Sequence, residues 1–129
     1  MNNDIIANAL SKINNAEKVN KKEVVLCPIS NLLIRILEIF EEKGYIEGFT
    51  IKEEDKKRYA IVKLSNTINK CGAIKPRFFV KKDEYDKYEK RYLPAANFGY
   101  LIVSTNQGLM TNEEAKERRI GGVLIAYIY

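Results

Sequence analysis

The residues best suited to recognition by hydrogen bonding form one short run, Ser104-Thr105-Asn106-Gln107-Gly108. Its hydroxyl and amide side chains can both donate and accept hydrogen bonds, and Gly108 would let another backbone approach closely. Double-stranded RNA presents 2′-hydroxyl groups and base edges in a wide, shallow minor groove, where compact groups of this kind fit. A polar run with a glycine is also typical of an ordinary turn, so the run by itself favours a turn over a binding site.

Basic residues are concentrated in the second half of the chain. The 129 residues include 22 Lys and Arg and 17 Asp and Glu, a net charge of +5. Residues 1–65 carry 11 basic and 10 acidic side chains, whereas residues 66–129 carry 11 and 7. Residues 66–82 contain no acid and five cations, which are Lys70, Lys75, Arg77, Lys81 and Lys82. This stretch is a candidate for contact with a polyanion, and a solvated basic loop is an equal alternative.

The composition excludes several kinds of catalytic site. The chain has no histidine, so it has no Ser-His or Cys-His nucleophile, no imidazole base and no zinc site of mixed cysteine and histidine ligands. The glycine motifs that bind phosphates in nucleotide enzymes are absent from the sequence. Four acids between residues 83 and 89 could form a carboxylate site, but lysines alternate with them, which is typical of a solvated helix face. We therefore expect no enzyme, no cofactor and no metal.

The two cysteines and the chain ends indicate a reduced, cytoplasmic protein. Cys27 and Cys71 are 44 positions apart and match no metal or redox spacing. Cys27 ends an apolar run before Pro28, and we expect both thiols to be packed as small hydrophobic groups. Residues 1–4 lack the features of a signal peptide. The apolar run at 123–129 has seven residues, against the roughly 20 that span a bilayer, so we expect no export and no membrane partner.

Periodicity predicts the element order α-β-α-β-β in the first half of the chain. The predicted elements are a helix at residues 4–14, a strand at 23–27, a helix between Ser30 and Gly44, and strands at 45–52 and 59–64. Asn3 or Asp4 is the expected cap of the first helix and Ser30 of the second, and Gly44 falls where a helix end needs positive φ. A charged turn at 53–57 would join the last two strands as an antiparallel hairpin.

The second half predicts a β-rich lobe with short helices. The predicted elements are a strand at 78–81, helices at 83–92 and from Thr111 to Gly121-Gly122, and strands at 98–104 and at the C-terminal end. Thr111 and Glu114 have the spacing of a capping box. Three tyrosines share one side of the helix at 83–92, which favours core or interface packing over base stacking. With a boundary near Thr67, the chain is predicted to be an α/β (α+β) protein of two small lobes, residues 1–66 and 67–129.

Several motifs lie in the order of a known family along nearly the whole chain. They are residues 4–10 with 13–16, 44–49, 69–78, 91–94 and 104–110, the last followed by 113–115 and 121–122. On these motifs the sequence closely resembles small-subunit ribosomal protein family eight, in its archaeal and eukaryotic branch. The 104–110 motif is the most specific of them.

The resemblance implies a primary rRNA-binding protein that docks on the central domain of the small-subunit rRNA, helps its assembly and stays in the cytoplasmic ribosome as a structural constituent. It implies that Ser104 to Gly108 enters the minor groove of an irregular helix, that the basic stretch holds phosphates, and that Gly121 and Gly122 belong to the site. The resemblance also implies two further partners, which are neighbouring small-subunit proteins of family five and a similar structure in its own mRNA.

Two positions depart from the family pattern. Asn31 stands where many relatives have lysine, and Val123 stands where bacterial relatives have glutamate, so neither a phosphate contact at 31 nor a role for that glutamate is carried over. An adaptor that docks a protein on Tyr85, Tyr88 and Tyr92 is the alternative to RNA binding, as is a translational regulator that binds mRNA. An enzyme acting through carboxylates comes third.

Overall fold

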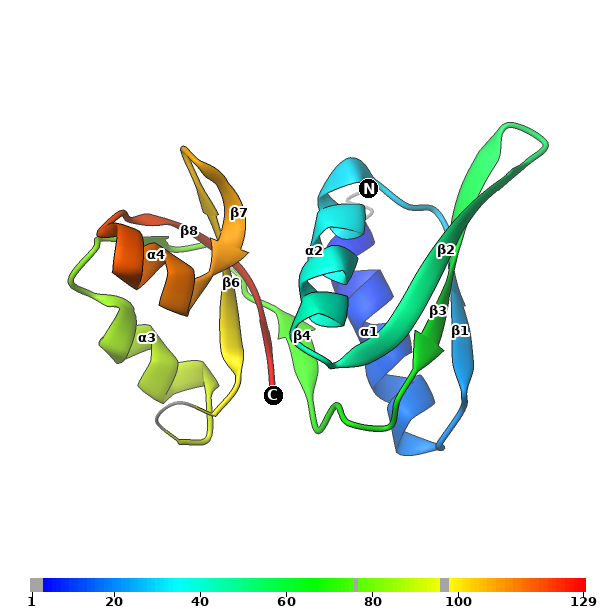
Figure 1. Ribbon diagram of the computed structural model, residues 1–129, viewed down its shortest axis with the longest axis horizontal. Coiled ribbons are helices and arrows are strands. Elements are labelled where there is room, and N and C mark those ends of the chain that lie inside the picture. The colour runs from blue at the N-terminus through cyan, green and yellow to red at the C-terminus, as the bar shows by residue number, and fades with distance from the viewer. Residues whose placement is uncertain (1–3, 76, 96–97) are drawn as a thin grey trace. The chain divides into compact units, whose positions relative to one another are not determined.

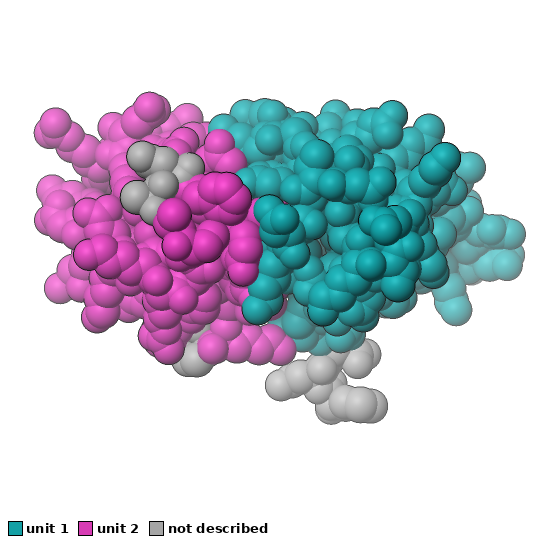
Figure 2. Space-filling model, turned by 90° about the horizontal axis from the view of Figure 1, so that it is seen from below, with its two compact units in different colours: residues 1–71 teal, residues 72–129 magenta. Residues whose placement is uncertain are grey.

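The computed structural model describes residues 4–75, 77–95 and 98–129. Contacts divide the chain into two compact units, residues 1–71 and 72–129, which Figure 2 colours separately. Cys71 belongs to the first unit because its backbone N–H donates to Asn14 Oδ1 at 3.3 Å and its thiol lies 3.4 Å from the carbonyl oxygen of Leu10. The domain boundary near Thr67 stays a prediction, because contacts do not show which piece folds independently.

The first unit has the predicted order of elements. They are α1 (Ile5–Lys18), β1 (Glu23–Leu26), α2 (Asn31–Glu42), β2 (Ile46–Glu54) and β3 (Lys57–Leu64). Asp4 and Ser30 cap the two helices, since Asp4 Oδ1 accepts from an N–H three residues on at 3.0 Å and Ser30 Oγ does the same at 3.2 Å. Gly44 has φ +81° just past α2, as expected. Asn3, the other candidate cap, lies outside the described residues.

The three strands of this unit form an antiparallel sheet in the order β1-β3-β2. The predicted hairpin is confirmed, but its strands run into the charged segment and leave only Asp55 and Lys56 as the turn. Both residues have positive φ, +52° and +65°, as in the two-residue turns whose twist matches that of paired strands. Helices α1 and α2 lie together on one side of this sheet (Figure 1), and Leu10, Phe40 and Val62 are fully buried.

The two thiols differ, and the prediction for one of them is wrong. Cys71 is buried as expected, and burial raises the pKa of its thiol to about 12. Cys27 is exposed. Because successive strand side chains point to opposite faces, the burial of Leu26 at the end of β1 turns the next residue outward. The Cys27 thiol lies 3.7 Å from the carbonyl oxygen of Arg58.

The second unit adds two strands that the sequence did not indicate. Strand β4 (Cys71–Ala73) begins at the last residue of the first unit and continues into the second. The other elements of the second unit are β5 (Phe79–Val80), α3 (Tyr85–Tyr92), β6 (Tyr100–Thr105), β7 (Gly108–Thr111), α4 (Asn112–Arg118) and β8 (Gly122–Ile128). The sheet order is β4-β8-β6-β7, and β5 also pairs with β8. The unexpected strands are β4, within the basic stretch, and β7, within the predicted polar loop. No helix in the described ranges has the length and apolar character to cross a membrane.

Helices α3 and α4 supply the core on one face of this sheet. Leu101, Val103 and Leu124 are fully buried there. Tyr85 joins them at 1% exposure, and its hydroxyl donates to the carbonyl oxygen of Ile120 at 2.9 Å. The alternative in which Tyr85 docks a protein partner together with Tyr88 and Tyr92 is therefore wrong for Tyr85, because its ring is buried and its hydroxyl is hydrogen-bonded inside the unit.

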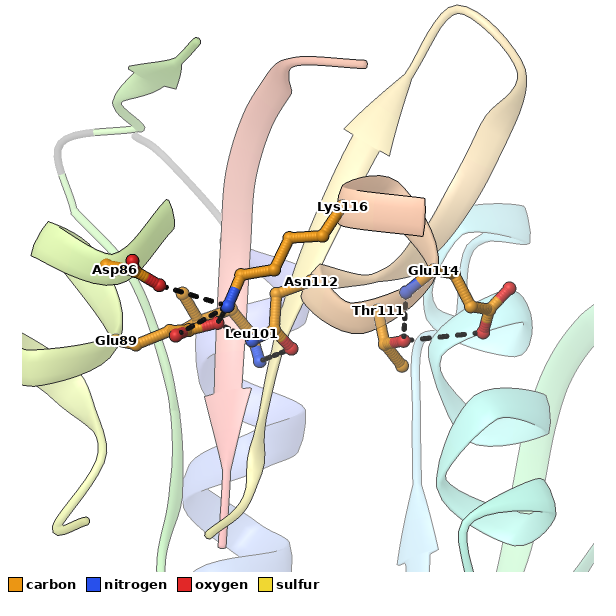
Figure 3. A network of polar contacts seen from close by, with 7 residues as sticks. All are labelled: Asp86, Glu89, Leu101, Thr111, Asn112, Glu114 and Lys116. Atoms are coloured by element: carbon orange, nitrogen blue, oxygen red, sulfur yellow. Dashed lines mark hydrogen bonds and ion pairs between the residues drawn. The ribbon is translucent and has the colours of Figure 1, made fainter. Parts of the chain in front are cut away.

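Helix α4 begins as predicted and ends differently. Thr111 Oγ1 accepts from the Glu114 N–H at 3.4 Å, and the threonine hydroxyl lies 3.4 Å from the glutamate carboxylate (Figure 3). The helix ends at Arg118, and Arg119 takes the left-handed conformation with φ +56°. Gly121-Gly122 was the predicted stop, and that prediction is wrong, because Arg119 supplies the turn before the glycines are reached.

Candidate nucleic-acid interface

The polar run at 104–108 is the tip of the β6–β7 hairpin. Ser104 pairs with Leu109 and Thr105 pairs with Gly108, so only Asn106 and Gln107 lie in the turn. Gly108 has φ +107° and nothing within 4 Å of the place where a Cβ would lie. Backbone conformation rather than packing therefore requires glycine at this position.

Two side chains of the tip hold its shape. The Thr105 hydroxyl donates to the carbonyl oxygen of Gly108 at 2.8 Å and accepts from the Gln107 N–H at 3.0 Å. The Gln107 amide oxygen accepts from Arg118 Nη1 at 3.1 Å. Asn106 is exposed in the turn, and Ser104 is half-buried at the end of β6. The tip therefore presents Asn106 and Ser104 on a turn whose shape Thr105 sets.

A hollow of about 320 Å³ lies between this tip and the start of β8. It is lined by Phe79, Ser104, Thr105, Asn106, Ile120, Gly121, Gly122 and Val123. None of these side chains is charged, and the polar ones are hydroxyl and amide groups. Such a lining is suited to 2′-hydroxyl groups and base edges rather than to phosphates.

The glycine pair forms the floor of the hollow and lets the strands approach. A Cβ on Gly122 would lie 2.5 Å from the carbonyl oxygen of Ser104, and one on Gly121 would lie against the carbonyl oxygen of Val80. No side chain larger than hydrogen fits at either place without moving a strand. The pair therefore sets the spacing of β5, β8 and β6, on which the position of Ser104 depends.

Comparison with known proteins shows the family of the chain. The family model described as Ribosomal protein S8 matches residues 4–129. The proteins named "Small ribosomal subunit protein uS8" from Nanoarchaeum equitans (strain Kin4-M) and from Archaeoglobus fulgidus are each 47% identical to this chain over 129 residues, which is the whole of both proteins in each comparison. The chain belongs to the ribosomal protein S8 family. The resemblance is thus confirmed, and the four helices and two antiparallel sheets of the described residues confirm the predicted α/β fold class.

The structure brings only part of the predicted basic set near the hollow of this S8-family protein. Lys81 and Lys82 directly follow β5 and are exposed. Lys82 lines a second hollow of about 350 Å³ together with Asp83, Lys116 and Arg119. Lys75 and Arg77 are exposed between β4 and β5, whereas Lys70 belongs to the first unit.

Sequence reasoning missed three residues at this face. Phe79 lines the hollow with 65% of its surface exposed, Arg118 contacts the hairpin tip, and Arg119 lines the second hollow. The two arginines carried a usable signal, since cations gather in the last turn of a helix. Phe79 lay in a predicted strand, but only the pairing of β5 with β8 shows which way it faces.

A polar network around the buried Asn112 side chain fixes α4 against α3 and β6 (Figure 3). Asn112 is 3% exposed, its Oδ1 accepts from the Leu101 N–H at 3.0 Å, and its Nδ2 donates to the Glu89 carboxylate. Lys116 Nζ lies 2.7 Å from Glu89 and 3.2 Å from Asp86. Burial lowers the pKa of Lys116, but hydrogen bonds and charges from the two acids outweigh it and raise the pKa above 10.5. Glu89 and Asp86 of the candidate carboxylate site are therefore engaged in this network.

Proposed function

We propose that this chain binds the central domain of the small-subunit rRNA through the β6–β7 tip and the hollow beside it, and that it helps the assembly of that region. As a member of its family, it is a structural constituent of the small subunit of the cytoplasmic ribosome rather than an enzyme. The observation that carries the proposal is the uncharged hollow between a fixed hydrogen-bonding turn and a glycine floor.

The proposed interface separates selectivity from affinity. Ser104 and Asn106 face groups of the minor groove, while the cations next to the hollow hold the phosphates that flank them. Lys81 and Lys82 follow β5 directly, and the exposed residues Lys75 and Arg77 precede it. Two further partners are proposed, which are neighbouring small-subunit proteins of family five and a similar structure in its own mRNA.

Substitutions in the tip test selective readout. Thr105→Ala removes the hydroxyl that makes two hydrogen bonds across the turn, each contributing about 0.5–1.5 kcal/mol. Gly108→Val puts a β-branched residue at φ +107°, a conformation that such residues avoid. We expect either change to weaken binding to a central-domain rRNA fragment much more than binding to a random duplex, in filter-binding titrations. Thr50→Ala, at an exposed position of β2, is the control. Equal losses on both RNAs would contradict selective readout by the tip.

The salt dependence of binding tests the phosphate contacts. Replacing Lys81 or Lys82 by alanine should lower the slope of log K against log salt by at most about one unit each, because each lysine neutralises at most one phosphate. Lys52→Ala, at an exposed position of the first unit, gives the comparison. A slope unchanged from that of the wild type would remove both lysines from the phosphate contacts.

A further inference from the structure

Strand β1 presents an unpaired edge in the first unit. It is the outermost strand of the sheet β1-β3-β2, and within the described ranges no strand pairs with its outer side. The carbonyl oxygen of Lys22 accepts from the Leu64 N–H at 2.8 Å, so the hydrogen bonds of this antiparallel pair fall on residues 22, 24 and 26. The N–H and C=O groups of Glu23 and Val25 therefore point outward, which is the arrangement that accepts a further strand.

Helix α1 forms the opposite wall of a groove along this edge. A hollow of about 420 Å³ lies between the first half of α1 and the end of β1, and another of about 600 Å³ lies between the second half of α1 and the start of β1. Lys12 lines both hollows, so they adjoin at its side chain. The side chains of α1 that line this α1–β1 groove at helical spacing are Ile5, Asn8, Lys12, Asn15 and Val19.

The α1–β1 groove matches a short extended peptide in length. The rise of α1 from Ile5 to Val19 is about 21 Å at about 1.5 Å per residue. An extended chain covers that distance with about six residues at about 3.3 Å each. Because strand side chains alternate between two faces, every second side chain of such a peptide would face α1. The buried alanines Ala9 and Ala16 lie on that side, and their small side chains leave room for larger ones.

The lining has apolar ends and a basic centre. At one end Val19 exposes 65% of its surface and Val25 exposes 52%, and Ile5 is half-buried at the other end. The exposed Lys12 lies between these ends. Glu23 is an acid in the lining, but Lys63 lies opposite it in β3 and offsets its charge. A peptide with an acidic side chain between two apolar ones is complementary to this pattern.

We infer that the α1–β1 groove docks an extended segment of a protein partner, which adds to the sheet as a strand beside β1. The segment has apolar, acidic and apolar side chains at alternate positions. Main-chain hydrogen bonds to Glu23 and Val25 supply affinity, and the groove selects the side chains. The inference goes beyond the proposed RNA binding, which is assigned to residues of the second unit.

Two other occupants fit the groove less well. Antiparallel pairing of two β1 strands from separate copies of this chain brings the middle of one groove against the middle of the other. The Lys12 side chains of both copies then meet, and like charges that face each other are unfavourable. RNA would be attracted by Lys12, but it has no alternating N–H and C=O groups to pair with a strand edge.

A titration with a designed peptide tests the docking site. The probe is a capped six-residue peptide with valine, aspartate and valine at alternate positions and threonine between them. The reading is the amide spectrum of the isotope-labelled 129-residue chain, in which the signals of Glu23, Val25 and the α1 lining residues should shift. A peptide with lysine in place of aspartate should bind more weakly. Unchanged groove signals at millimolar peptide would overturn the proposal.

Reversing the charge of the groove tests its selectivity. Lys12→Glu replaces an attraction to the aspartate by a repulsion, and it should weaken binding of the aspartate peptide by about 2- to 30-fold, since each exposed charge pair has a modest effect. The same variant should bind the lysine peptide more tightly than the wild type does. Lys57→Glu makes an equal change of charge at an exposed residue that lines neither hollow. Equal effects of the two variants would contradict selection by Lys12.

A proline substitution tests the pairing of the strand edge. Val25→Pro removes an N–H that points away from β3, so no hydrogen bond inside the sheet is lost. The peptide should bind at least about tenfold more weakly to this variant, because proline takes away a donor and crowds the edge. Val25→Thr keeps the N–H and the branched shape, and it should retain most of the affinity. Melting curves verify folding, and the Lys12 reversal decides the question if V25P does not fold.

The remaining outcomes identify a different occupant. If a six-nucleotide RNA shifts the groove signals and the peptide does not, the groove binds RNA and the proposal is wrong. If sedimentation equilibrium shows a dimer that V25P abolishes, the groove pairs two copies of the chain, and the proposal is again wrong. K12E should keep the wild-type affinity for the central-domain rRNA fragment, so failure of peptide binding leaves the proposed function untouched, and failure of rRNA binding by the wild type leaves the groove untouched.

Discussion

The Asn112 side chain offers a sharp test of how the second unit is held together. It is a buried amide at the first position of α4, and both its oxygen and its nitrogen form hydrogen bonds. Its oxygen accepts the N–H of Leu101 in β6, and its nitrogen donates to Glu89 in α3. Asn112→Ala removes both contacts and leaves the other groups of the network in place.

The expected loss follows from the two partners that remain. Leu101 is fully buried, and an N–H without an acceptor in such a place costs about 1–3 kcal/mol. A hydrogen bond to a charged group contributes about 1.5–3 kcal/mol. The loss at Glu89 should be smaller than this, because its carboxylate retains the ion pair with Lys116 and is 17% exposed to solvent. Together, the two losses should lower the free energy of unfolding by about 2–5 kcal/mol. With an unfolding entropy near 0.27 kcal/mol/K for a chain of 129 residues, the melting temperature should fall by about 7–18 °C.

Thermal and urea unfolding, monitored by circular dichroism, measure this loss. Asn106→Ala makes the same chemical change at an exposed turn position and should shift stability by no more than about 0.5 kcal/mol. Asn112→Asp keeps the acceptor for Leu101 but sets a carboxylate against Glu89, so it should be destabilised at neutral pH and recover as the pH falls. If Asn112→Ala were as stable as the Asn106→Ala control, the buried amide would not be holding α4.

Three further predictions concern packing, thiol reactivity and pH. Gly122→Ala forces a Cβ to 2.5 Å from the Ser104 carbonyl oxygen and should lower the unfolding free energy by about 1–3 kcal/mol, whereas Gly48→Ala, whose nearest contact is at 3.8 Å, should not. In a thiol titration of the native protein near pH 8, Cys27 should react quickly because it is exposed. Cys71, whose pKa burial raises to about 12, should react only after denaturation; rapid reaction of both thiols would contradict its burial. Burial also raises the pKa of Glu17 above 4.5, so the folded state disfavours the charged form of this carboxyl group. As the pH falls from neutral through the raised pKa, the folded state binds a proton more readily than the unfolded state does. The free energy of unfolding of the wild type should therefore increase relative to that of Glu17→Gln as the pH is lowered. Denaturation midpoints at a series of pH values measure this difference, and a constant difference would refute it.

The elements that local sequence determines were predicted well. Ser30 and Thr111 each cap the helix that follows, because a cap depends only on residues within one turn. The apolar periods of α1 and α2 are long enough to show a buried face. The strand at the C-terminal end is apolar throughout and was predicted for the same reason.

The errors came from features that only distant contacts determine. Strand β7 is four residues long and pairs with β6, and nothing in its own sequence distinguishes it from a loop. The glycine pair looked like a helix stop, but its reason is the approach of Ser104 and Val80 from other strands. The direction of Phe79 likewise follows from pairing with β8. The candidate residues of the tip could thus be named from the sequence, whereas the hollow that they line could not.

An uncharged recognition surface depends on rigid support more than a basic one does. A neutral hydrogen bond contributes only about 0.5–1.5 kcal/mol net, and that gain is lost once donor and acceptor are out of line, whereas attraction to a phosphate acts over a Debye length of about 8–10 Å. In the proposed interface, Lys81 and Lys82 can therefore act from flexible side chains, but Ser104 and Asn106 must be held in place. The internal hydrogen bonds of Thr105 hold the turn, and the glycine floor sets the strands beneath it. A change at Gly122 should therefore reduce selectivity for the RNA site, even though a residue at that position has no hydrogen-bonding side chain to offer the RNA.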